Sequence, residues 1–464
     1  MNKQIRFNAL DMNCAGGTPG LWLHPEDRTL GYNTMEYWME LARLLERGFF
    51  DSLFIADIFG IYDVYGGNAN AGIRNAVEFP VNDPWMLVPA MAAVTKHLSF
   101  GITGSATYET PYNFARRIST LDHLTNGRLA WNIVTGYLDS AARAFGLERQ
   151  LPHDERYVKA AEFMELVYKL WEGSWEDGAV LRDKANGIFA LPEKIHKVRH
   201  QGKYFRMEGY HLCEPSPQRT PILFQAGSSN TGRQFAAQHA ECVFIGGANP
   251  KVVAATVADL RQRAAALGRD PNSLLIFAAL VIIAAETDAA AQAKVDDYYK
   301  YVSTEGTLAL LSGYMGIDFS TKNLDEPLPI DEINAIRGSS ESFRRADPNR
   351  VWTLRNAVER LGVAGYKPLL VGSPKTVADG LMAWMEESGI DGFNVEYVVS
   401  PGDFAAVVDL VVPELQRRGV YKTKYAEGTL RQKLYGGTRQ YLPSDHPGAA
   451  FRRTSSAAIQ TPDS

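Results

Sequence analysis

The chain has 464 residues, 45% of them hydrophobic and 22% charged, a composition typical of a folded protein with a sizeable core and one that excludes disorder over most of the length. A net charge of −5 and a pI near 6.0 provide no basic surface, so a small neutral ligand is expected rather than nucleic acid or a membrane. Three scattered cysteines form neither a disulfide framework nor a C-x-x-C metal site, which favours a reducing cytoplasm.

Short β-rich runs alternate with longer amphipathic stretches along the chain, a pattern typical of βαβ units around a parallel sheet. Strands are predicted at residues 5–10, 52–56, 98–103, 128–134, 221–226, 242–245, 274–284 and 392–397. Helices are predicted at residues 35–47, 84–97, 111–124, 154–171, 232–239, 250–267, 289–301, 351–361, 374–388 and 404–418. Eight strands with right-handed crossovers favour a closed α/β barrel of the (β/α)8 TIM type over an open doubly wound sheet.

Four segments depart from this alternation. Residues 1–420 are expected to form one barrel with an insertion near 173–220, which is polar and rich in turns. A second insertion near 303–347 loses clear periodicity, and we expect a surface excursion there that could act as a lid. Residues 421–453 are predicted to form a polar C-terminal arm, and residues 454–464 a flexible tail of small residues. No apolar run is long enough to span a membrane.

Polar and aromatic residues follow the predicted strands, where the working side chains of such a barrel lie. They are Asp11 to Cys14 after the first strand; Asp57, Phe59, Tyr62 and Tyr65 after the second; Ser105 and Tyr108 after the third; and Tyr137 after the fourth, with Asn132 on that strand. These residues are therefore candidates for a site at the barrel mouth.

The segment GSSNTG at residues 227–232 joins the fifth strand to a helix. Backbone N–H groups, the hydroxyls of Ser228 and Ser229 and the helix dipole would all attract an anion such as a phosphate. A helix N-cap made by Ser229 or Asn230 explains the same residues equally well.

His153 and Tyr157 lie one helical turn apart and face the same side. Both could point into a site, although a packing histidine and a buried tyrosine are the more ordinary interpretation. Cys14 lacks a histidine at a defined position, which disfavours a nucleophile. The nine histidines form no H-x-x-x-H pair with an intervening glutamate, and no G-x-G occurs, so metal catalysis and a dinucleotide fingerprint have no support.

Two long stretches, FNALDMNCAGGTPGLW at 7–22 and ARRISTLDHLTNGRLAWNIVT at 115–135, resemble the bacterial-luciferase-like flavin-dependent monooxygenases. The likeness is to the branch with nitrilotriacetate, dibenzothiophene sulfone and dimethyl sulfide monooxygenases, and most of all to long-chain alkane monooxygenase. Further matches include HDERY at 153–157, QAGSSNTGRQFAAQHAECVF at 225–244 and SGIDGFNVEYVVSPGDF at 388–404. Together they cover nearly the whole chain and imply the same barrel.

The resemblance implies a cofactor and a set of contacts. Reduced FMN would lie across the barrel mouth, with its phosphate at Tyr157, Ser228 and Ser229. Asp57, Ser105 and Asn132 would face its ring or ribityl chain. A separate NAD(P)H:flavin reductase would supply FMNH2, and O2 would add to it at C4a or N5. Homodimers or homotetramers are expected.

Catalytic candidates that follow from the resemblance are His153, Cys14 and Tyr137. The alkane-oxidising member carries a histidine after the Asn-Cys-x-Gly segment and another past the fourth strand, where this chain has Gly17 and Tyr137. The pocket wall is therefore expected to differ, which argues against an alkane substrate. Rings and amides mix in the loop that carries Tyr62, Tyr65, Asn68 and Asn70, which suits a planar or heteroatom-bearing substrate, or else these residues pack the flavin edge. The candidates for the substrate pocket are Phe59, Tyr62, Tyr65 and Tyr108.

The main hypothesis is a two-component FMNH2-dependent monooxygenase that oxidises or oxidatively cleaves a small organic molecule, such as an alkane, an organosulfur compound or an N-heterocycle such as a flavin. A deazaflavin-dependent dehydrogenase on the same barrel and a non-catalytic flavin-binding protein are the alternatives. Oxygen consumption would distinguish the first alternative, and the absence of any product the second.

Overall fold

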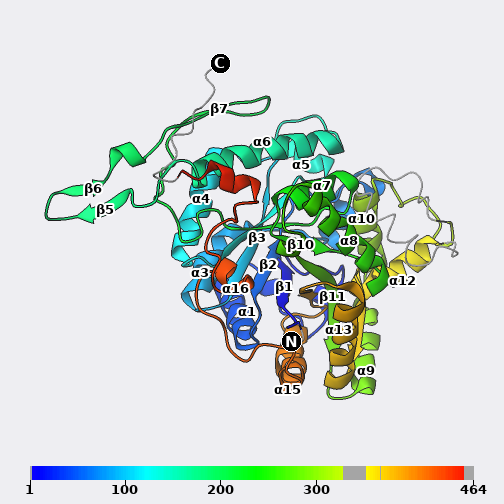
Figure 1. The fold of residues 1–464 in the computed structure, drawn as a ribbon. Coiled ribbons are helices and arrows are strands. Elements are labelled where there is room, and N and C mark those ends of the chain that lie inside the picture. The colour runs from blue at the N-terminus through cyan, green and yellow to red at the C-terminus, as the bar shows by residue number, and fades with distance from the viewer. Residues whose placement is uncertain (1–2, 328–351, 366, 454–464) are drawn as a thin grey trace.

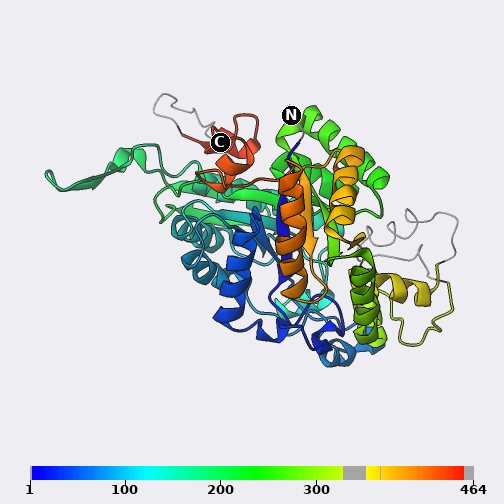
Figure 2. The same ribbon diagram turned by 90° about the horizontal axis from the view of Figure 1, so that it is seen from below.

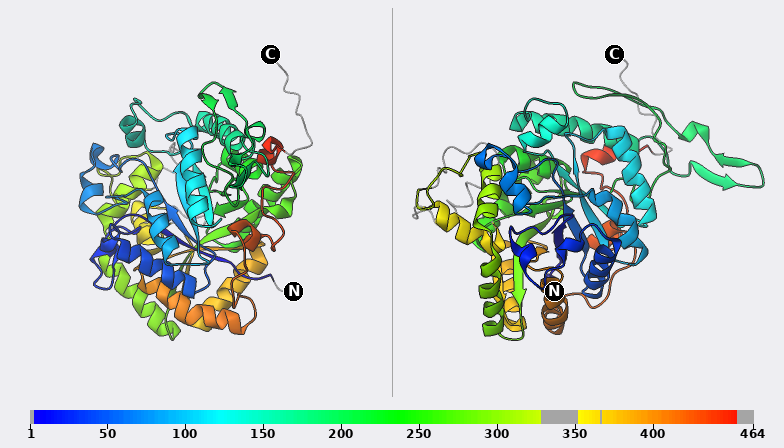
Figure 3. Two further views of the ribbon diagram at one scale, coloured as in Figure 1. Left: turned by 90° about the vertical axis from the view of Figure 1, so that its left-hand side faces the viewer. Right: turned by 180° about the vertical axis from the view of Figure 1, so that it is seen from behind.

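The computed structural model describes residues 3–327, 352–365 and 367–453. Eight parallel strands form a closed barrel in the order β10-β9-β4-β3-β2-β1-β13-β11, and pairing between β10 and β11 closes it. Helices surround the strands (Figures 1 and 3). The predicted barrel is thereby confirmed. Its strands are β1 (Phe7–Met12), β2 (Ser52–Ala56), β3 (Ser99–Ser105), β4 (Leu129–Val134), β9 (Ile222–Gln225), β10 (Cys242–Ile245), β11 (Leu275–Ala284) and β13 (Gly392–Glu396).

The outer layer consists of helices that follow the strands in sequence. They are α1 (Met35–Arg47), α3 (Val88–Ala93), α4 (Pro111–Leu124), α6 (His153–Trp171), α7 (Asn230–His239), α8 (Pro250–Ala266), α13 (Pro374–Ser388), α14 (Gly402–Ala406) and α15 (Val412–Arg417). A π-helical turn, Val407–Val411, joins α14 to α15. It precedes Pro413, which has no N–H to donate to the carbonyl of Asp409 and so interrupts the regular ladder.

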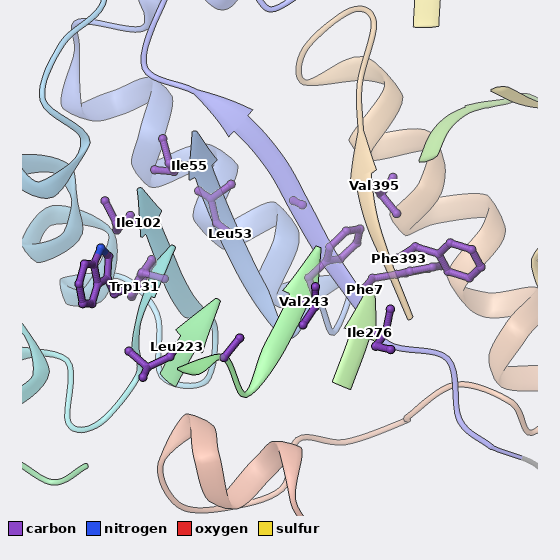
Figure 4. Packing of buried hydrophobic residues seen from close by; sticks show 14 of the residues in the cluster. Phe7, Leu53, Ile55, Ile102, Trp131, Leu223, Val243, Ile276, Phe393 and Val395 are labelled. Carbon is purple, nitrogen blue, oxygen red and sulfur yellow. The ribbon is translucent and has the colours of Figure 1, made fainter. Parts of the chain in front are cut away.

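Side chains of the strands alternate between two cores, because successive residues of a strand point to opposite faces. Outward residues pack under the helices (Figure 4); they include Phe7, Leu53, Ile55, Ile102, Trp131, Leu223, Val243, Ile276, Phe393 and Val395. Inward residues fill the barrel and include Leu10, Phe54, Ala130, Ile222, Phe224, Cys242 and Phe277. The interior is thus packed below its mouth.

The region expected to lose periodicity after residue 303 contains a regular helix, α10 (Thr304–Met315), so that part of the prediction is wrong. Leu308, Leu311 and Met315 are buried in a cluster with α12 (Leu354–Ala364). The sequence pattern does not predict this helix, because it is apolar on most sides and shows no amphipathic stripe. The rest of the expected lid, from 328 to 347, lies outside the described residues.

A short strand missed in the sequence, β12 (Leu369–Gly372), pairs with the second half of β11 outside the closed barrel. The remaining helices are α2 (Asn70–Arg74), α5 (Asp139–Ala144), α9 (Asp288–Tyr298) and α16 (Leu430–Leu434). Among the described residues, no helix combines the length and apolar character needed to cross a membrane.

Residues 173–220, expected to be an insertion, contain two antiparallel hairpins. The strands are β5 (Val180–Asp183) with β6 (Ile188–Ala190), and β7 (Val198–Gln201) with β8 (Arg206–Gly209). The β5–β6 hairpin projects from the body of the molecule (Figure 2). Neither hairpin contributes to the barrel sheet.

The segment expected to be a C-terminal arm packs against the end of the barrel opposite the mouth. Leu430 and Leu434 of α16 join the apolar cluster of the barrel interior. Between them, the fully buried Arg431 forms an ion pair with the buried Glu241, at 2.7 Å between Nε and Oε1. Its guanidinium also donates to the carbonyls of Thr220 and Pro221, before β9. The segment thus closes the end of the barrel opposite the mouth.

Arg431→Met is expected to lower the free energy of unfolding by about 3–5 kcal/mol, because it leaves the Glu241 carboxylate buried without its ion-pair partner. Urea unfolding followed by tryptophan fluorescence measures the change. The double variant Arg431→Met/Glu241→Gln should recover part of the loss. Arg355→Met, which breaks the exposed pair with Asp325, should cost less than about 1 kcal/mol. Equal effects of Arg431→Met and Arg355→Met would contradict this assignment.

Candidate functional site

A pocket of about 230 Å³ opens at the carboxyl ends of β2, β3, β4 and β9; we call it the strand-end pocket. Its lining includes the predicted site residues Asp57, Phe59, Ser105, Tyr108, Tyr137, His153, Tyr157, Ser228 and Ser229. A larger open groove lies between α6 and the β7–β8 hairpin, away from the strand ends. There Glu162 accepts hydrogen bonds from His200 and the backbone of Phe205, so these groups satisfy one another. The strand-end pocket is therefore the candidate site.

The segment 227–232 forms one corner of the pocket. Ser229 is the N-cap of α7, and its Oγ accepts a hydrogen bond from the Gly232 N–H at 3.0 Å. A Cβ atom at Gly232 would lie 2.7 Å from the Tyr157 hydroxyl, and one at Gly227 would lie 2.7 Å from the Gly232 Cα. Only glycine permits this close approach of loop, helix and tyrosine. The N-cap interpretation is confirmed, and it leaves the helix N-terminus facing the pocket.

Tyr157 and His153 extend from the first turns of α6 into the same pocket, as their spacing predicts. Their ring centroids are 5.3 Å apart. Burial raises the pKa of the Tyr157 phenol, while hydrogen bonding with Ser229, Gln225 and Thr135 opposes the rise. The His153 Nδ1 lies 2.7 Å from the Asp154 carboxylate, which fixes the orientation of the ring. One end of the pocket is therefore rich in hydrogen-bonding groups.

Arg156 also lines the pocket and was missed in the sequence, although it is part of the HDERY motif. It is only 6% exposed, and within the described part of the chain its Nε has no hydrogen-bond partner and its guanidinium forms no ion pair. Burial lowers its pKa, and the carboxylates of Asp139 and Asp154 act only at longer range. An unpaired buried cation beside a helix N-terminus is a strong attractor for an anion.

Asp57 follows β2 and lines the opposite part of the pocket. Burial, with a further contribution from the negative charge of Asp83, raises its pKa to about 8. The carboxyl therefore holds its proton near neutral pH and can donate a hydrogen bond to a ligand.

Ser105 and Asn132 lie near the strand ends, and of these two only Ser105 lines the pocket. The Ser105 Oγ accepts from the backbone N–H groups of Thr107 and Tyr108, which stabilises the turn after β3. Asn132 donates to the Thr103 hydroxyl at 2.9 Å, and its buried Oδ1 has no partner among the described residues. Asn132 directly precedes Ile133, a lining residue, on β4. The structure therefore places Ser105 in the wall and Asn132 beneath it.

Aromatic side chains form the outer wall. Tyr108 stacks on Phe145 with centroids 4.4 Å apart, and Phe59 packs edge-on against both rings. The Tyr108 hydroxyl accepts a hydrogen bond from Gln150 at 2.6 Å. Tyr65 lies outside this wall and packs against the cluster around α10. Phe145 is the C-cap of the short helix α5, which the sequence pattern does not predict, so its place in this wall was not expected.

A second cavity of about 210 Å³ lies at the ends of β1, β2 and β13. Gly17, Glu78, Tyr314, Lys367 and Glu396 line it, and Lys367 forms an ion pair with Glu396. The predicted residues Tyr62 and Tyr137 connect the two cavities, since the Tyr62 hydroxyl is hydrogen bonded to both Tyr137 and Glu78. Glu78 carried no signal in the sequence, because it lies in a loop between a short helix and a proline.

Cys14 is buried at 1% exposure and lines neither cavity. Burial raises the pKa of its thiol well above the usual range, and the neighbouring charges of Glu78 and Asp11 add to the shift. A neutral thiol is a poor nucleophile. The described residues also contain no group of three or more histidine, cysteine or acidic side chains placed to hold a metal.

The family model described as luciferase-like monooxygenase matches residues 16–392. The chain belongs to this family. It is 48% identical over 453 residues to dimethyl-sulfide monooxygenase of Hyphomicrobium sulfonivorans, covering 97% of this chain and 94% of the relative. It is 50% identical over 457 residues to long-chain alkane monooxygenase of Geobacillus thermodenitrificans, covering 98% and 100%. A solved riboflavin lyase has a TM-score of 0.90 at 36% identity, covering 97% and 100%.

Asp57→Asn should change how stability depends on pH. In the unfolded chain Asp57 titrates near its ordinary value of 3.8, but in the fold its pKa is about 8, so the folded state binds the proton more tightly between these values. The wild type should therefore lose stability relative to the variant as pH rises through this window, by up to about 1.4 kcal/mol per pH unit, and no further above it. Urea unfolding midpoints of both proteins test this, and a pH-independent difference would rule it out.

Proposed function

We propose that this luciferase-like monooxygenase is the oxygenase component of a two-component system. It would bind FMNH2 from a separate NAD(P)H:flavin reductase and use O2 to oxidise or oxidatively cleave a small organic molecule. The single observation that carries the proposal is Arg156, a buried cation without an ion-pair partner among the described residues, at the N-terminus of α7. The phosphate of a flavin mononucleotide would supply the negative charge that pairs with this cation.

The remaining residues fit the other parts of FMN. The phosphate would bind to Arg156, Tyr157, Ser228 and Ser229. The Oδ1 of Asn132, which has no partner among the described residues, and the protonated carboxyl of Asp57 can bond to the donors and acceptors of a ribityl chain or ring edge. When bound in reduced form, the flavin supplies the two electrons that activate O2, which no protein side chain here can supply.

The protein's own part is to position the reactants and to exclude water. The Phe59, Tyr108 and Phe145 wall shields the pocket on the solvent side. His153, held by Asp154, is placed to exchange a proton with a bound ligand. Tyr137 lines the pocket, where it can contact the substrate. Cys14 has a buried, neutral thiol, so we propose that it acts only indirectly, by supporting the residues around it.

Two relatives support the substrate class. The riboflavin lyase structure contains a modified FMN and riboflavin, and another relative acts on dimethyl sulfide. In this chain, Glu78, Tyr62, Tyr137 and Tyr314 place polar groups between the cavities. We therefore propose a heteroatom-bearing substrate rather than an alkane. We also propose that the enzyme is cytoplasmic and forms a homodimer or homotetramer.

A substrate screen tests the function directly. The protein is incubated with FMN, NADH, a generic flavin reductase and O2, and candidate organosulfur compounds, N-heterocycles and alkanes are analysed by mass spectrometry for added oxygen or cleavage. Reductase alone is the control. Oxygen-independent hydride transfer to a deazaflavin would instead identify a dehydrogenase. Tight FMN binding without product from any compound would identify a carrier.

Ser229→Ala/Tyr157→Phe should weaken FMN binding at least about tenfold, equivalent to about 1.4 kcal/mol. Arg156→Met should do the same, because each variant removes hydrogen bonds or charge from the phosphate corner. Quenching of FMN fluorescence measures the affinity. Ser373→Ala removes the N-cap of α13, far from the site, and controls for loss of a cap. FMN affinity within twofold of wild type in the first two variants would refute the assignment.

His153→Ala should abolish product formation while FMN affinity stays within about twofold of wild type, since the ring lies beside the phosphate corner without being its main ligand. The comparison uses product yield per FMNH2 and the fluorescence titration above. Asp154→Asn, which keeps the ring but weakens its orienting bond, should give an intermediate yield. Unchanged turnover in His153→Ala would remove the proposed role.

A further inference from the structure

Three side chains form a continuous hydrogen-bonded path from the strand-end pocket to the second cavity. Tyr137 lines the pocket, and its hydroxyl lies 2.6 Å from that of Tyr62. The Tyr62 hydroxyl lies 2.7 Å from the Glu78 Oε2, and Glu78 lines the second cavity. Tyr314 donates to the other carboxyl oxygen of Glu78 at 3.3 Å. Every link is therefore between groups that can gain and lose a proton.

Packing holds this path in place. Tyr62 is 1% exposed, and its ring lies so close to α10 that a Cβ at Gly313 would come within 2.1 Å of it. The Tyr314 ring packs edge-on against both Tyr62 and Tyr137. A tyrosine fixed this tightly keeps its hydroxyl between two partners without an entropic cost at each turnover.

Glu78 occupies the end of the path where a proton can be stored. Tyr62, Tyr314, Lys367, Glu396 and Cys14 are the titratable groups that act on it. Burial raises the pKa of Glu78, the charge of Glu396 adds to the rise, and the two tyrosine bonds and Lys367 oppose it. Gly17 and Lys367, which line the same cavity, are partly exposed and give water a way in.

The protonation state of Glu78 sets the direction of the hydrogen bonds. When Glu78 is ionised, Tyr62 donates to it and accepts from Tyr137. When Glu78 is protonated, it can donate to Tyr62, which then donates to Tyr137, and the Tyr137 hydrogen is directed away from Tyr62. The same three groups can therefore orient the Tyr137 hydroxyl in two opposite ways.

We propose that Glu78, Tyr62 and Tyr137 form a proton relay that delivers a proton from the second cavity to the reacting oxygen in the strand-end pocket. Tyr137 gives its proton to that oxygen and takes one from Tyr62, which takes one from the Glu78 carboxyl. Three O–H bonds break and three form, and Glu78 is left as a carboxylate that takes up one proton from solvent through water in the second cavity. Tyr137 is the catalytic residue; Tyr62 and Glu78 act through it.

The relay rests on the proposed function and meets a requirement of its stoichiometry. Anionic reduced flavin, O2, a substrate S and one proton give oxidised flavin, SO and water, so one proton must enter at each turnover. Without substrate, the same flavin, O2 and one proton give oxidised flavin and hydrogen peroxide. A pocket filled by flavin and substrate excludes bulk water from the reacting oxygen, so the proton needs an internal route.

Infrared difference spectroscopy of the flavin-free protein tests the first half of the proposal. The C=O band of a protonated carboxyl should disappear as pH rises, with a midpoint above the ordinary value for glutamate, and Glu78→Gln should lack this band change. Tyr62→Phe should move the midpoint upward, because it removes a bond that favours the carboxylate. A band unaffected by Glu78→Gln and Tyr62→Phe would overturn the relay, whether or not FMN binds.

Stopped-flow reoxidation of bound FMNH2 by O2, without substrate, tests the second half. The wild-type rate should fall as pH rises through the infrared midpoint, because the relay delivers its proton only when Glu78 is protonated. Below this midpoint, Glu78→Gln and Tyr62→Phe should be about 100-fold slower, the effect expected for loss of a general acid, and should lack the pH step. Tyr421→Phe removes a buried phenol bonded to the backbone near α1 and should behave as wild type.

The possible results distinguish a proton relay from a purely structural role of Glu78, and failure of the relay from failure of the proposed function. Slower reoxidation in Glu78→Gln with the wild-type pH step retained would show that the residue only supports the fold, and would overturn the relay. Rates within twofold of wild type in both variants would also overturn it. Failure of the wild type to bind FMN would instead refute the proposed function, while the infrared titration would still report on Glu78.

Discussion

Pairing between β10 and β11 closes the sheet, and this closure determines where the chemistry can lie. It brings the carboxyl ends of all the barrel strands to one mouth. Asp57, Gln225 and Glu396 therefore lie at the same end of the barrel, although more than half of the chain separates the first from the last. The buried Arg431–Glu241 pair closes the opposite end. With one end plugged and the interior packed, the mouth is where open space remains at the strand ends.

The barrel could be predicted because its strands are short, apolar and separated by amphipathic helices. Strand side chains face either the helices or the packed interior, so runs such as Leu275–Ala284 are apolar throughout. Elements outside this alternation were harder to find. α10 is buried on most sides and shows no amphipathic stripe, while β12 is a strand of four residues that pairs with the second half of β11.

The polar corner of the strand-end pocket, formed by Tyr157, Ser228 and Ser229, could be predicted in part, because these residues belong to local patterns with a physical meaning. Arg156 was missed although it lies beside Tyr157, since sequence alone does not show that an arginine is buried without an ion pair. Glu78 and Tyr314 meet only because α10 packs over the loop after α2. Such contacts between distant segments leave no periodic trace, and only the folded arrangement reveals them.

Under the proposed function, Arg156, which has no ion-pair partner among the described residues, also links the amount of folded protein to the cofactor. A guanidinium taken out of water without a counter-ion destabilises the flavin-free state, and an anion bound beside it restores the balance only in the folded chain. Under the proposed function, cells that run short of flavin would hold more of this enzyme in a form open to proteolysis. Supply of the cofactor would then govern the lifetime of the enzyme as well as its turnover.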